Sequence, residues 1–381
     1  MERCPYAKKC GGCDYQGIPY QKQLLMKQES VQKLLSEFCP VHPIQGMDHP
    51  YHYRNKVHAV FSRQRSGQIV SGIYEENSHR VVPVDACQIE NEKADAIICD
   101  IRDMLRSFKI TIYNENSGQG LLRHVLIRTA SRTGQILVVL VVTSPVFPSK
   151  NNFVKDLRKK YPEITSVVLN INEKRTSMVL GKRDIVLYGP GFIEDCICDM
   201  TFRISAQSFY QINPPQAEKL YKKAIELASL SGTERVIDAY CGTGTIGIAA
   251  SPFAGEVIGI ELNPEAVKDA MRNAKSNQIK NIRFFNADAG EFMEQMASDG
   301  EKADVVIMDP PRSGSTEQFL QSTVHLSPQK IIYISCNPQT QRRDLLFLQK
   351  LGYKAEEAWP FDFFGFTEHV ETVVLMSRVK G

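Results

Sequence analysis

Apolar residues in the second half of the chain form short runs that alternate with amphipathic stretches. The runs with the character of buried strands are ERVIDAY, VIGIEL, IRFFNAD, ADVVIMDPP and KIIYISCNP, and a helical pattern, PEAVKDAMRNAKSN, follows the second of them. Strands that alternate with helices predict a mainly parallel, doubly wound α/β sheet of Rossmann-like type. GYKAEEAWPF and HVETVVLMSRV have no full helix between them, which predicts a C-terminal antiparallel hairpin at the sheet edge.

The first half of the chain has a different pattern. Apolar residues recur at helical spacing over residues 19–38, and Pro40 limits this amphipathic helix. LLRHVLIRTA and QILVVLVVTS, separated by SRTG, predict a β-hairpin, FVKDLRKKY predicts a short helix and SVVLNIN a further strand; from residue 53 to 200 the pattern is mainly that of strands. We therefore expect an α+β domain made of residues 1–18 and 45–200, a helical connector at 19–44, and the doubly wound domain at 201–381.

The composition of the 381 residues is that of an ordinary globular protein, with 43% hydrophobic and 23% charged residues. No apolar run reaches the roughly 18 residues of a membrane span, and the N-terminus has no apolar signal core, so we expect a cytoplasmic protein that contacts no membrane. The net charge of +3 permits a nucleic acid as a partner without requiring one. Ten cysteines without a signal peptide favour a metal site and a catalytic thiol over a disulfide framework.

A glycine-rich loop lies between the first strand of the doubly wound region and the helix that follows. Gly242, Gly244 and Gly247 form the pattern G-x-G-x-x-G, and Glu261 ends the next strand. A carboxylate at that place accepts hydrogen bonds from ribose hydroxyls, so the spacing is typical of both NAD and S-adenosylmethionine sites. A tight strand-to-helix turn that binds no ligand is the structural alternative.

Two later strand ends favour S-adenosylmethionine over NAD. Asp288 follows the third strand and is placed to contact an adenine amine. Asp309 precedes Pro310 and Pro311 at the end of the fourth strand. Because the two prolines fix φ and lack a backbone donor, they are expected to form a rigid wall beside a flat base. The structural alternative for Asp309 is a helix N-cap.

Cys336 follows the strand IIYIS, so it is expected at the carboxyl edge of the sheet, where ligands bind in open α/β folds. A thiol reacts as the thiolate, which costs roughly 2 kcal/mol at pH 7 for an unperturbed pKa, so we expect the local field to lower the pKa of Cys336 modestly. Glu371 is the first candidate for an accompanying base, and Glu368 and His369 compete with it. A buried, inert cysteine is the alternative at position 336.

Together, SFYQIN (208–213), DAYCGTGTIG, DPPR, SCNP and the C-terminal HVE resemble the RNA uracil-C5 methyltransferase family over essentially the whole second half of the chain. The resemblance implies that Cys336 adds to C6 of a uridine, that C5 takes the methyl group of S-adenosylmethionine, and that Glu371 accepts the C5 proton. It also implies contacts of S-adenosylmethionine with Gln211, Tyr240, Thr245, Glu261, Asp288 and Asp309.

The chain departs from the family pattern in two places. Position 245 is often Asn in the family and is Thr here, which affects its expected cofactor contact. The family often reads D-M-F-P-H-T before its final glutamate, whereas residues 362–367 read D-F-F-G-F-T. The loop around the base is therefore expected to have a different shape, while Glu371 keeps its spacing.

The N-terminal cysteines have the spacing of a metal site. Cys4, Cys10 and Cys13, with Cys87 as a distant fourth thiol, suit zinc or a [4Fe–4S] cluster, since both accept four thiolates. The pattern resembles the 23S rRNA branch of the family, which implies an iron–sulfur cluster rather than zinc, and 23S rRNA rather than tRNA as the substrate. Many relatives carry a small β-barrel RNA-binding domain before these cysteines, and we expect that domain to be absent here.

Two basic groups are candidates for contacts with RNA phosphates: Arg54, Lys56, Arg63 and Arg65, and Arg123, His124, Arg128 and Arg132. Alternate residues of a strand share a face, so part of each group can line one groove, and a solvated strand face is the alternative. The leading hypothesis is a monomeric 23S rRNA (uracil-C5)-methyltransferase that acts on RNA and not on DNA, with tRNA as the second choice of substrate. An NAD-dependent iron–sulfur oxidoreductase and a non-catalytic RNA-binding factor are the remaining hypotheses.

Overall fold

The computed structural model describes residues 3–75 and 78–379, and the chain forms two compact units. Unit 1 comprises Met1–Ile18, His49–Asp195 and Arg203–Gln207, and unit 2 comprises Pro19–Asp48, Cys196–Phe202 and Ser208–Gly381. Each unit has its own hydrophobic core. No helix among the described residues is both long enough and apolar enough to cross a membrane.

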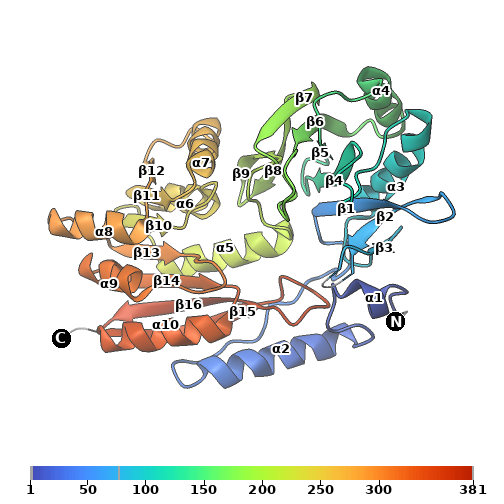
Figure 1. Ribbon diagram of the computed structural model, residues 1–381. Coiled ribbons are helices and arrows are strands. Elements are labelled where there is room, and N and C mark those ends of the chain that lie inside the picture. The colour runs from blue at the N-terminus through green and yellow to red at the C-terminus, as the bar shows by residue number, and fades with distance from the viewer. Residues whose placement is uncertain (1–2, 76–77, 380–381) are drawn as a thin grey trace. The chain divides into compact units, whose positions relative to one another are not determined.

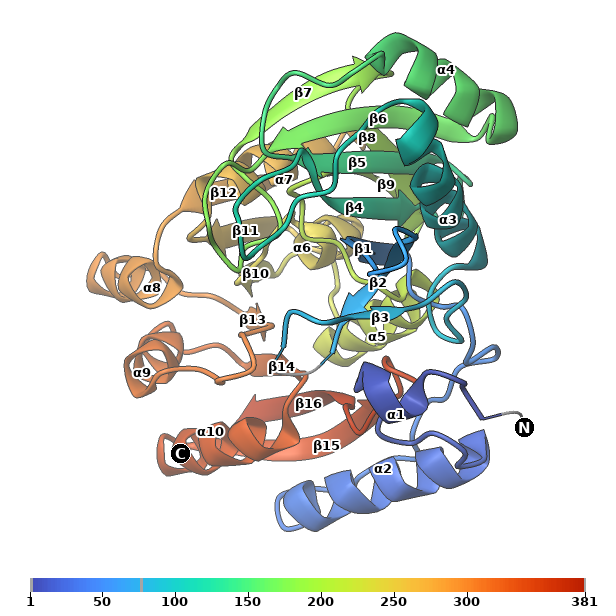
Figure 2. The same ribbon diagram turned by 45° about the vertical axis from the view of Figure 1, so that its right-hand side comes forward.

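Unit 1 is built on a mixed sheet that has seven strands within the described residues, in the order β3-β2-β1-β4-β5-β6-β7. The strands are β1 (Lys56–Arg63), β2 (Ile69–Tyr74), β3 (Val81–Pro83), β4 (Leu122–Thr129), β5 (Ile136–Val142), β6 (Ile164–Ile171) and β7 (Arg183–Tyr188). The helices α3 (Glu92–Ser107) and α4 (Lys150–Lys160) pack their apolar residues against one face of this sheet (Figure 2). A short helix, α1 (Ala7–Cys10), lies near the N-terminus.

The expected hairpin, helix and strand in this region are confirmed as β4–β5, α4 and β6. The interpretation of residues 53–200 as mainly strands is wrong at α3. Ile97, Ile101 and Leu105 are buried on one face of that helix, at the spacing of successive turns. Asn91 caps its N-terminus by accepting hydrogen bonds from the backbone N–H groups of Lys93 and Ala94 at 3.1 and 3.2 Å.

Unit 2 contains the doubly wound sheet, which has seven strands within the described residues in the order β12-β11-β10-β13-β14-β16-β15. The strands are β10 (Arg235–Ala239), β11 (Glu256–Glu261), β12 (Ile282–Asn286), β13 (Val305–Met308), β14 (Lys330–Ser335), β15 (Tyr353–Phe361) and β16 (Glu371–Arg378). The strands from β10 to β14 pair in parallel, and β16 is antiparallel to both β14 and β15. The predicted parallel sheet with an antiparallel C-terminal hairpin at its edge is thus confirmed.

Helices cover both faces of this sheet (Figure 1). The hydrophobic core on one face includes residues of α2 (Tyr20–Leu35), α8 (Ala289–Ser298), α9 (Glu317–His325) and α10 (Pro338–Lys350). On the other face lie α5 (Pro214–Ala228), α6 (Thr245–Ala250) and α7 (Pro264–Ser276), with a single 3₁₀ turn at Ser251–Phe253. The strands β8 (Phe192–Ile197) and β9 (Met200–Ser205) pair with each other.

Candidate active site

The glycine-rich loop follows β10 and leads into α6. Tyr240, at the end of the strand, has φ of 62°, a left-handed conformation that is costly for a residue with a Cβ and that is concentrated at functional sites. Glu261, at the end of β11, accepts hydrogen bonds from the backbone N–H of Gly242 at 3.1 Å and of Asn263 at 2.8 Å. The predicted ribose-binding carboxylate is therefore held directly beside the loop.

Two glycines of this loop are required by close packing. Gly244 has φ of 79°, and a Cβ at this position would lie 2.9 Å from the ring of Phe284. A Cβ at Gly247 would lie 2.8 Å from Oδ2 of Asp238, which accepts the backbone N–H of Gly247 at 2.8 Å. Gly244 thus needs glycine for its left-handed turn and for its packing on Phe284, and Gly247 needs it for the close approach of α6 to Asp238.

Tyr221 on α5 lies near three of the residues that are predicted to contact the cofactor. Its side chain is 2% exposed and is hydrogen-bonded to the side chains of Thr245 and Gln211. Burial, and then the nearby charge of Asp309, raise the pKa of Tyr221 above its ordinary value. Tyr221 could not be singled out from the sequence, because it is part of the buried face of α5 and belongs to no motif. Thr245, which replaces the usual Asn, supports this tyrosine.

Two carboxyl groups near the loop are withdrawn from solvent: Asp238 is buried and Asp309 is half-buried. Burial, together with the nearby charges of Asp309 and Glu261, raises the pKa of Asp238 to about 7, although the hydrogen bond from the backbone N–H of Gly247 opposes the rise. Burial also raises the pKa of Asp309 to about 7. Both groups are therefore poorly solvated in the charged form, and a cationic ligand would favour that form. The N-cap alternative for Asp309 finds no support among the described helices, since the next helix, α9, is capped by Thr316.

Tyr240 follows β10 and Asp288 follows β12, so both lie at the carboxyl edge of the parallel strands. Tyr240 is half-buried, lies near Ser315, and packs on Phe319 with 4.9 Å between ring centroids. The Asp288 charge is near enough to contribute to the raised pKa of Tyr240, about 12, whose main cause is burial. Asp288 also caps α8, because its Oδ1 accepts the N–H groups of Gly290 and Glu291 at 2.9 and 3.1 Å.

Cys336 follows β14 and is half-buried. Burial raises the pKa of its thiol to about 11, and the charges of Glu371 and Asp309 act in the same direction. Arg312 opposes them, both by its charge and by a hydrogen bond to the thiol. The expected lowering of the pKa is therefore wrong for the protein by itself, because two carboxylates and the loss of solvent outweigh one arginine.

Glu371 opens β16, which pairs with β14, the strand that ends beside Cys336. Its side chain is buried, and burial, followed by the charge of Asp309, raises its pKa well above the ordinary value, while Arg312 lowers it. Glu368, a competing candidate base, is exposed, and His369 is half-buried. The structure thus brings Cys336, Glu371 and Asp309 together. Arg312 lies near these residues as well. Its position directly after Pro311 in the DPPR motif was the signal in the sequence that could have identified it.

The N-terminal thiols are in unit 1. Burial raises the pKa of Cys10 and of Cys13, and Cys4 is near enough to raise both further. Burial, followed by the charge of Glu90, raises the pKa of Cys87 to about 12, and Glu90 acts on Cys10 as well. In residues 3–75 and 78–379, no group of three or more His, Cys, Asp or Glu is arranged to hold a metal ion. The four-thiolate site stays a prediction.

The structure brings members of the two basic groups of unit 1 together. Lys56 and Arg128 are directly opposite each other on β1 and β4, and Arg54 is close to Lys56. Arg123 is turned into the protein instead, where it donates to the carbonyl oxygens of Asn172 and Lys174 at 3.0 and 2.6 Å. The expectation that Arg123 is a candidate for phosphate contact is therefore corrected: its guanidinium is used within unit 1.

Comparison with solved structures first defines the class of protein. The chain is similar to tRNA (uracil-54, C5)-methyltransferase from Pyrococcus abyssi, solved in complex with S-adenosyl-L-homocysteine, with a TM-score of 0.81 and 26% identity, over 96% of this chain and 86% of that one. The fold is thus that of an S-adenosylmethionine-dependent methyltransferase.

Sequence comparison then gives the family. The chain is 40% identical to an uncharacterized RNA methyltransferase from Bacillus cereus, over 99% of this chain and 83% of that protein, and 41% identical to one from Caldanaerobacter subterraneus, over 99% and 84%. The sequence model of the tRNA (uracil-5-)-methyltransferase family matches residues 19–379. The protein belongs to this family of RNA uracil-C5 methyltransferases.

Proposed function

We propose that the protein methylates C5 of a uridine in RNA, with Cys336 as the covalent nucleophile and Glu371 as the base. The observation that carries this proposal is the electrostatic neighbourhood of Cys336, which includes Glu371, Asp309 and Arg312 at one edge of the sheet of unit 2. A nucleophile, a base and a cation that favours the thiolate are the groups that addition to a pyrimidine ring requires.

In the proposed reaction, the Cys336 thiolate adds to C6 of the uracil ring, and the electrons of the C5–C6 double bond move towards the C4 carbonyl oxygen. S-adenosylmethionine supplies the methyl group that C5 then takes. Glu371 accepts the proton from C5, the C5–C6 double bond forms again, and the bond between C6 and Sγ breaks to release the thiolate. The raised pKa of Glu371 gives its carboxylate a greater proton affinity than that of an ordinary glutamate, which suits a base.

The test uses uridine-containing RNA, S-adenosylmethionine and a denaturing gel. Cys336→Ala is expected to abolish both methylation and any covalent protein–RNA adduct. Glu371→Gln is expected to accumulate the adduct, because release of the thiol stalls after methyl transfer. Glu368→Gln, which changes an exposed neighbour in the same segment, is the matched control and should turn over normally. The role assignment fails if Cys336→Ala and Glu371→Gln give the same gel pattern.

For the contact with RNA we propose the face of unit 1 that carries Arg54 and Lys56. Arg128 lies beneath that face, since it is 4% exposed and donates to the carbonyl oxygen of Ala206 at 3.4 Å. Val57, Ala59 and Phe61 of β1 belong to the core beneath α3 and α4, so the alternating residues Lys56 and His58 face the other way. Cations on one strand face can neutralise successive phosphates.

For the identity of the RNA we propose 23S rRNA, on the spacing of the N-terminal cysteines alone. The printed names of the matching family and of the Pyrococcus abyssi protein refer to tRNA, which makes tRNA the second candidate. Mapping 5-methyluridine in both RNAs from cells that lack the protein distinguishes them: loss from 23S rRNA supports the first candidate, and loss from tRNA replaces it.

We also propose that Cys4, Cys10, Cys13 and Cys87 bind a [4Fe–4S] cluster, with zinc as the alternative. The proposal is supported by the mutual electrostatic range of the first three thiols and by the shared neighbour Glu90 of Cys10 and Cys87. Methyl transfer needs no redox step, so the group would stabilise this part of unit 1. Protein purified without oxygen is expected to be brown and to contain iron and sulfide; stoichiometric zinc would overturn the choice of metal.

A further inference from the structure

The segment before Glu371 is a loop that is largely buried. Residues 362–370 connect β15 to β16, and Asp362, Phe363 and Phe366 are each no more than 1% exposed. Phe366 has φ of 67°, a left-handed conformation that a bulky residue rarely adopts without support from its surroundings. Because Glu371 follows this loop directly, whatever fixes the loop also influences where the carboxylate of Glu371 lies.

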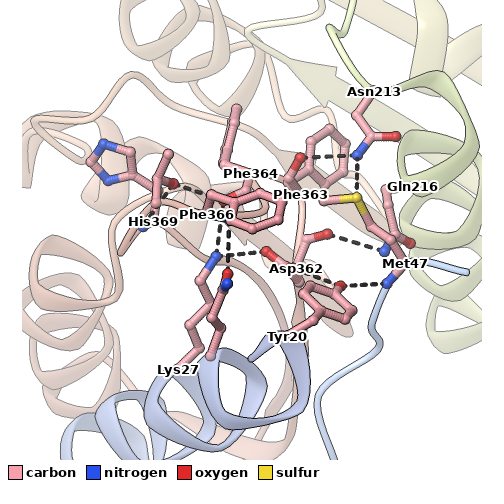
Figure 3. Close-up of polar contacts among 12 residues, drawn as sticks. Tyr20, Lys27, Met47, Asn213, Gln216, Asp362, Phe363, Phe364, Phe366 and His369 are labelled. Atoms are coloured by element: carbon pink, nitrogen blue, oxygen red, sulfur yellow. Dashed lines mark hydrogen bonds and ion pairs between the residues drawn. The ribbon is translucent and has the colours of Figure 1, made fainter. Parts of the chain in front are cut away.

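A lysine from the other end of the chain enters this loop. Lys27 on α2 forms an ion pair with Asp362, with 2.6 Å between Nζ and Oδ1, and neither side chain is exposed. The same ammonium group donates to the carbonyl oxygen of Phe364 at 3.0 Å. Tyr20, at the start of the same helix, donates its hydroxyl to the second carboxylate oxygen of Asp362 at 2.7 Å. Figure 3 shows these contacts converging on Asp362.

Other residues of unit 2 hold the backbone of the loop. The side chain of Gln23 accepts the backbone N–H of Phe366 at 2.9 Å. From α5 and the residue before it, Gln216 donates to the carbonyl oxygen of Asp362 and Asn213 to that of Phe363, both at 3.0 Å (Figure 3). The backbone of the loop is therefore fixed by side chains from two helices that are distant from it in sequence.

The ion pair is a costly way to gain stability alone. Moving two charges out of water carries a large desolvation penalty, and well-packed apolar residues often stabilise a core equally well. A buried pair does, however, constrain geometry, because each charge must find its partner and its hydrogen bonds in one arrangement. At this place the constrained segment is the one that leads to the proposed base.

We propose that Lys27 and Asp362 are positioning residues for the proton-removal step. They fix residues 362–370 in the conformation that holds the carboxylate of Glu371 against C5 of the uridine, and they take no part in the addition of Cys336 to C6. This inference rests on the proposed function and adds to it a step-specific role for two residues that do not touch the reacting atoms.

The test compares two RNAs that differ in one atom. With 5-fluorouridine RNA, C5 carries no proton for a base to remove after methyl transfer, so the adduct with Cys336 accumulates whatever the state of Glu371. With uridine RNA, turnover needs the base. Lys27→Met and Asp362→Asn are expected to form the 5-fluorouridine adduct at the parent rate, to turn over uridine RNA roughly 10- to 100-fold more slowly, and to accumulate the uridine adduct.

Two further variants separate positioning from stability. Glu37→Gln removes an exposed ion pair with Arg342, close to the end of the same helix, and should change neither rate. The double variant Lys27→Met/Asp362→Leu leaves no unpaired charge, so it is expected to recover the melting temperature lost in the single variants but not the rate of elimination.

The proposal is overturned if folded single variants turn over uridine RNA at the parent rate. It is also overturned if the double variant recovers turnover together with stability, or if formation of the 5-fluorouridine adduct slows as much as turnover does. Failure of the parent protein to form any Cys336-linked adduct with 5-fluorouridine RNA would instead refute the proposed function itself.

Discussion

Unit 1 and unit 2 each gather groups of like charge, but the sign is opposite. On β1 and β4 of unit 1, burial and then the charges of Arg128 and Arg54 lower the pKa of Lys56 to about 8. At the sheet edge of unit 2, burial raises the pKa of both Asp238 and Asp309 to about 7. In both places the protein by itself shifts the protonation equilibrium of the group towards its neutral form.

The difference indicates what each place is suited to bind. A cluster of poorly solvated cations gains most from a polyanion, and the phosphates of RNA have that character. A cluster of poorly solvated carboxyl groups gains most from a compact cation, and the sulfonium of S-adenosylmethionine is one. Each ligand would therefore restore the charged form of the groups that it meets, so binding energy is coupled to proton uptake in unit 1 and to proton release in unit 2.

The largest effect is expected for Asp309→Asn. If Asp309 contacts S-adenosylmethionine as the family resemblance implies, removal of the carboxylate should lower the rate of methyl transfer roughly 100-fold or more, since a preorganised charge beside the sulfonium would be lost. The same change should stabilise the protein. Because the pKa of Asp309 is raised in the folded state, its contribution to stability is present at low pH and is lost as the pH rises from about 4 to about 7.

Thermal unfolding in the absence of ligand checks the second part of this prediction. At pH 8 the Asn variant is expected to melt about 2–4 °C above the parent protein, and at pH 4 the two should melt together. Asp299→Asn, at an exposed helix end, is the control and should show no such pH dependence. If Asp309→Asn is less stable than the parent protein at pH 8, the carboxylate of Asp309 is already stabilised by groups of the protein and does not depend on a bound cation.

The sequence was sufficient to predict the sheet of unit 2 and the meeting of Asp309, Cys336 and Glu371. These residues lie at the ends of β13, β14 and β16, which are neighbours in the sheet, and strand ends can be recognised from local patterns. An open α/β sheet then brings such ends to one edge without any knowledge of side-chain packing.

The groups that surround these residues could not be predicted in the same way. Lys27 and Asp362 are 335 positions apart, and a lysine at helical spacing in a polar stretch reads as a solvated residue. The pKa of Cys336 was expected to move in the wrong direction, because its burial and the approach of Glu371 depend on tertiary packing. Chemistry that belongs to a motif is visible in a sequence, whereas the electrostatic setting of that chemistry is a property of the fold.

A smaller effect is expected from removing cations in unit 1. The double variant Arg54→Gln/Lys56→Gln should weaken RNA binding by roughly 10- to 100-fold at low salt, and should reduce the slope of log affinity against log salt by about 1 to 2. Lys159→Gln removes a positive charge from α4, on the opposite face of the same sheet, and is the matched control. Equal losses in the control and the double variant would show a general charge effect rather than a binding face.

The smallest effect is a pH dependence carried by Lys56. Its pKa in the protein alone is about 8, and a bound phosphate is expected to raise it, so binding takes up a proton above that pH. RNA affinity should therefore fall on the order of tenfold from pH 7.5 to pH 9.5. His58 should not mask this change, because burial lowers its pKa below the usual 6.5 and it stays neutral over this range.

Lys56→Arg makes the test specific, because an arginine stays charged over this range and its RNA affinity should follow the pH only as far as the RNA itself titrates. The affinities of both proteins are measured by titration of one RNA at constant salt. If the parent protein and Lys56→Arg lose affinity in parallel, Lys56 is not in contact with phosphate. The lowered pKa of Lys56 is then only a consequence of packing within unit 1.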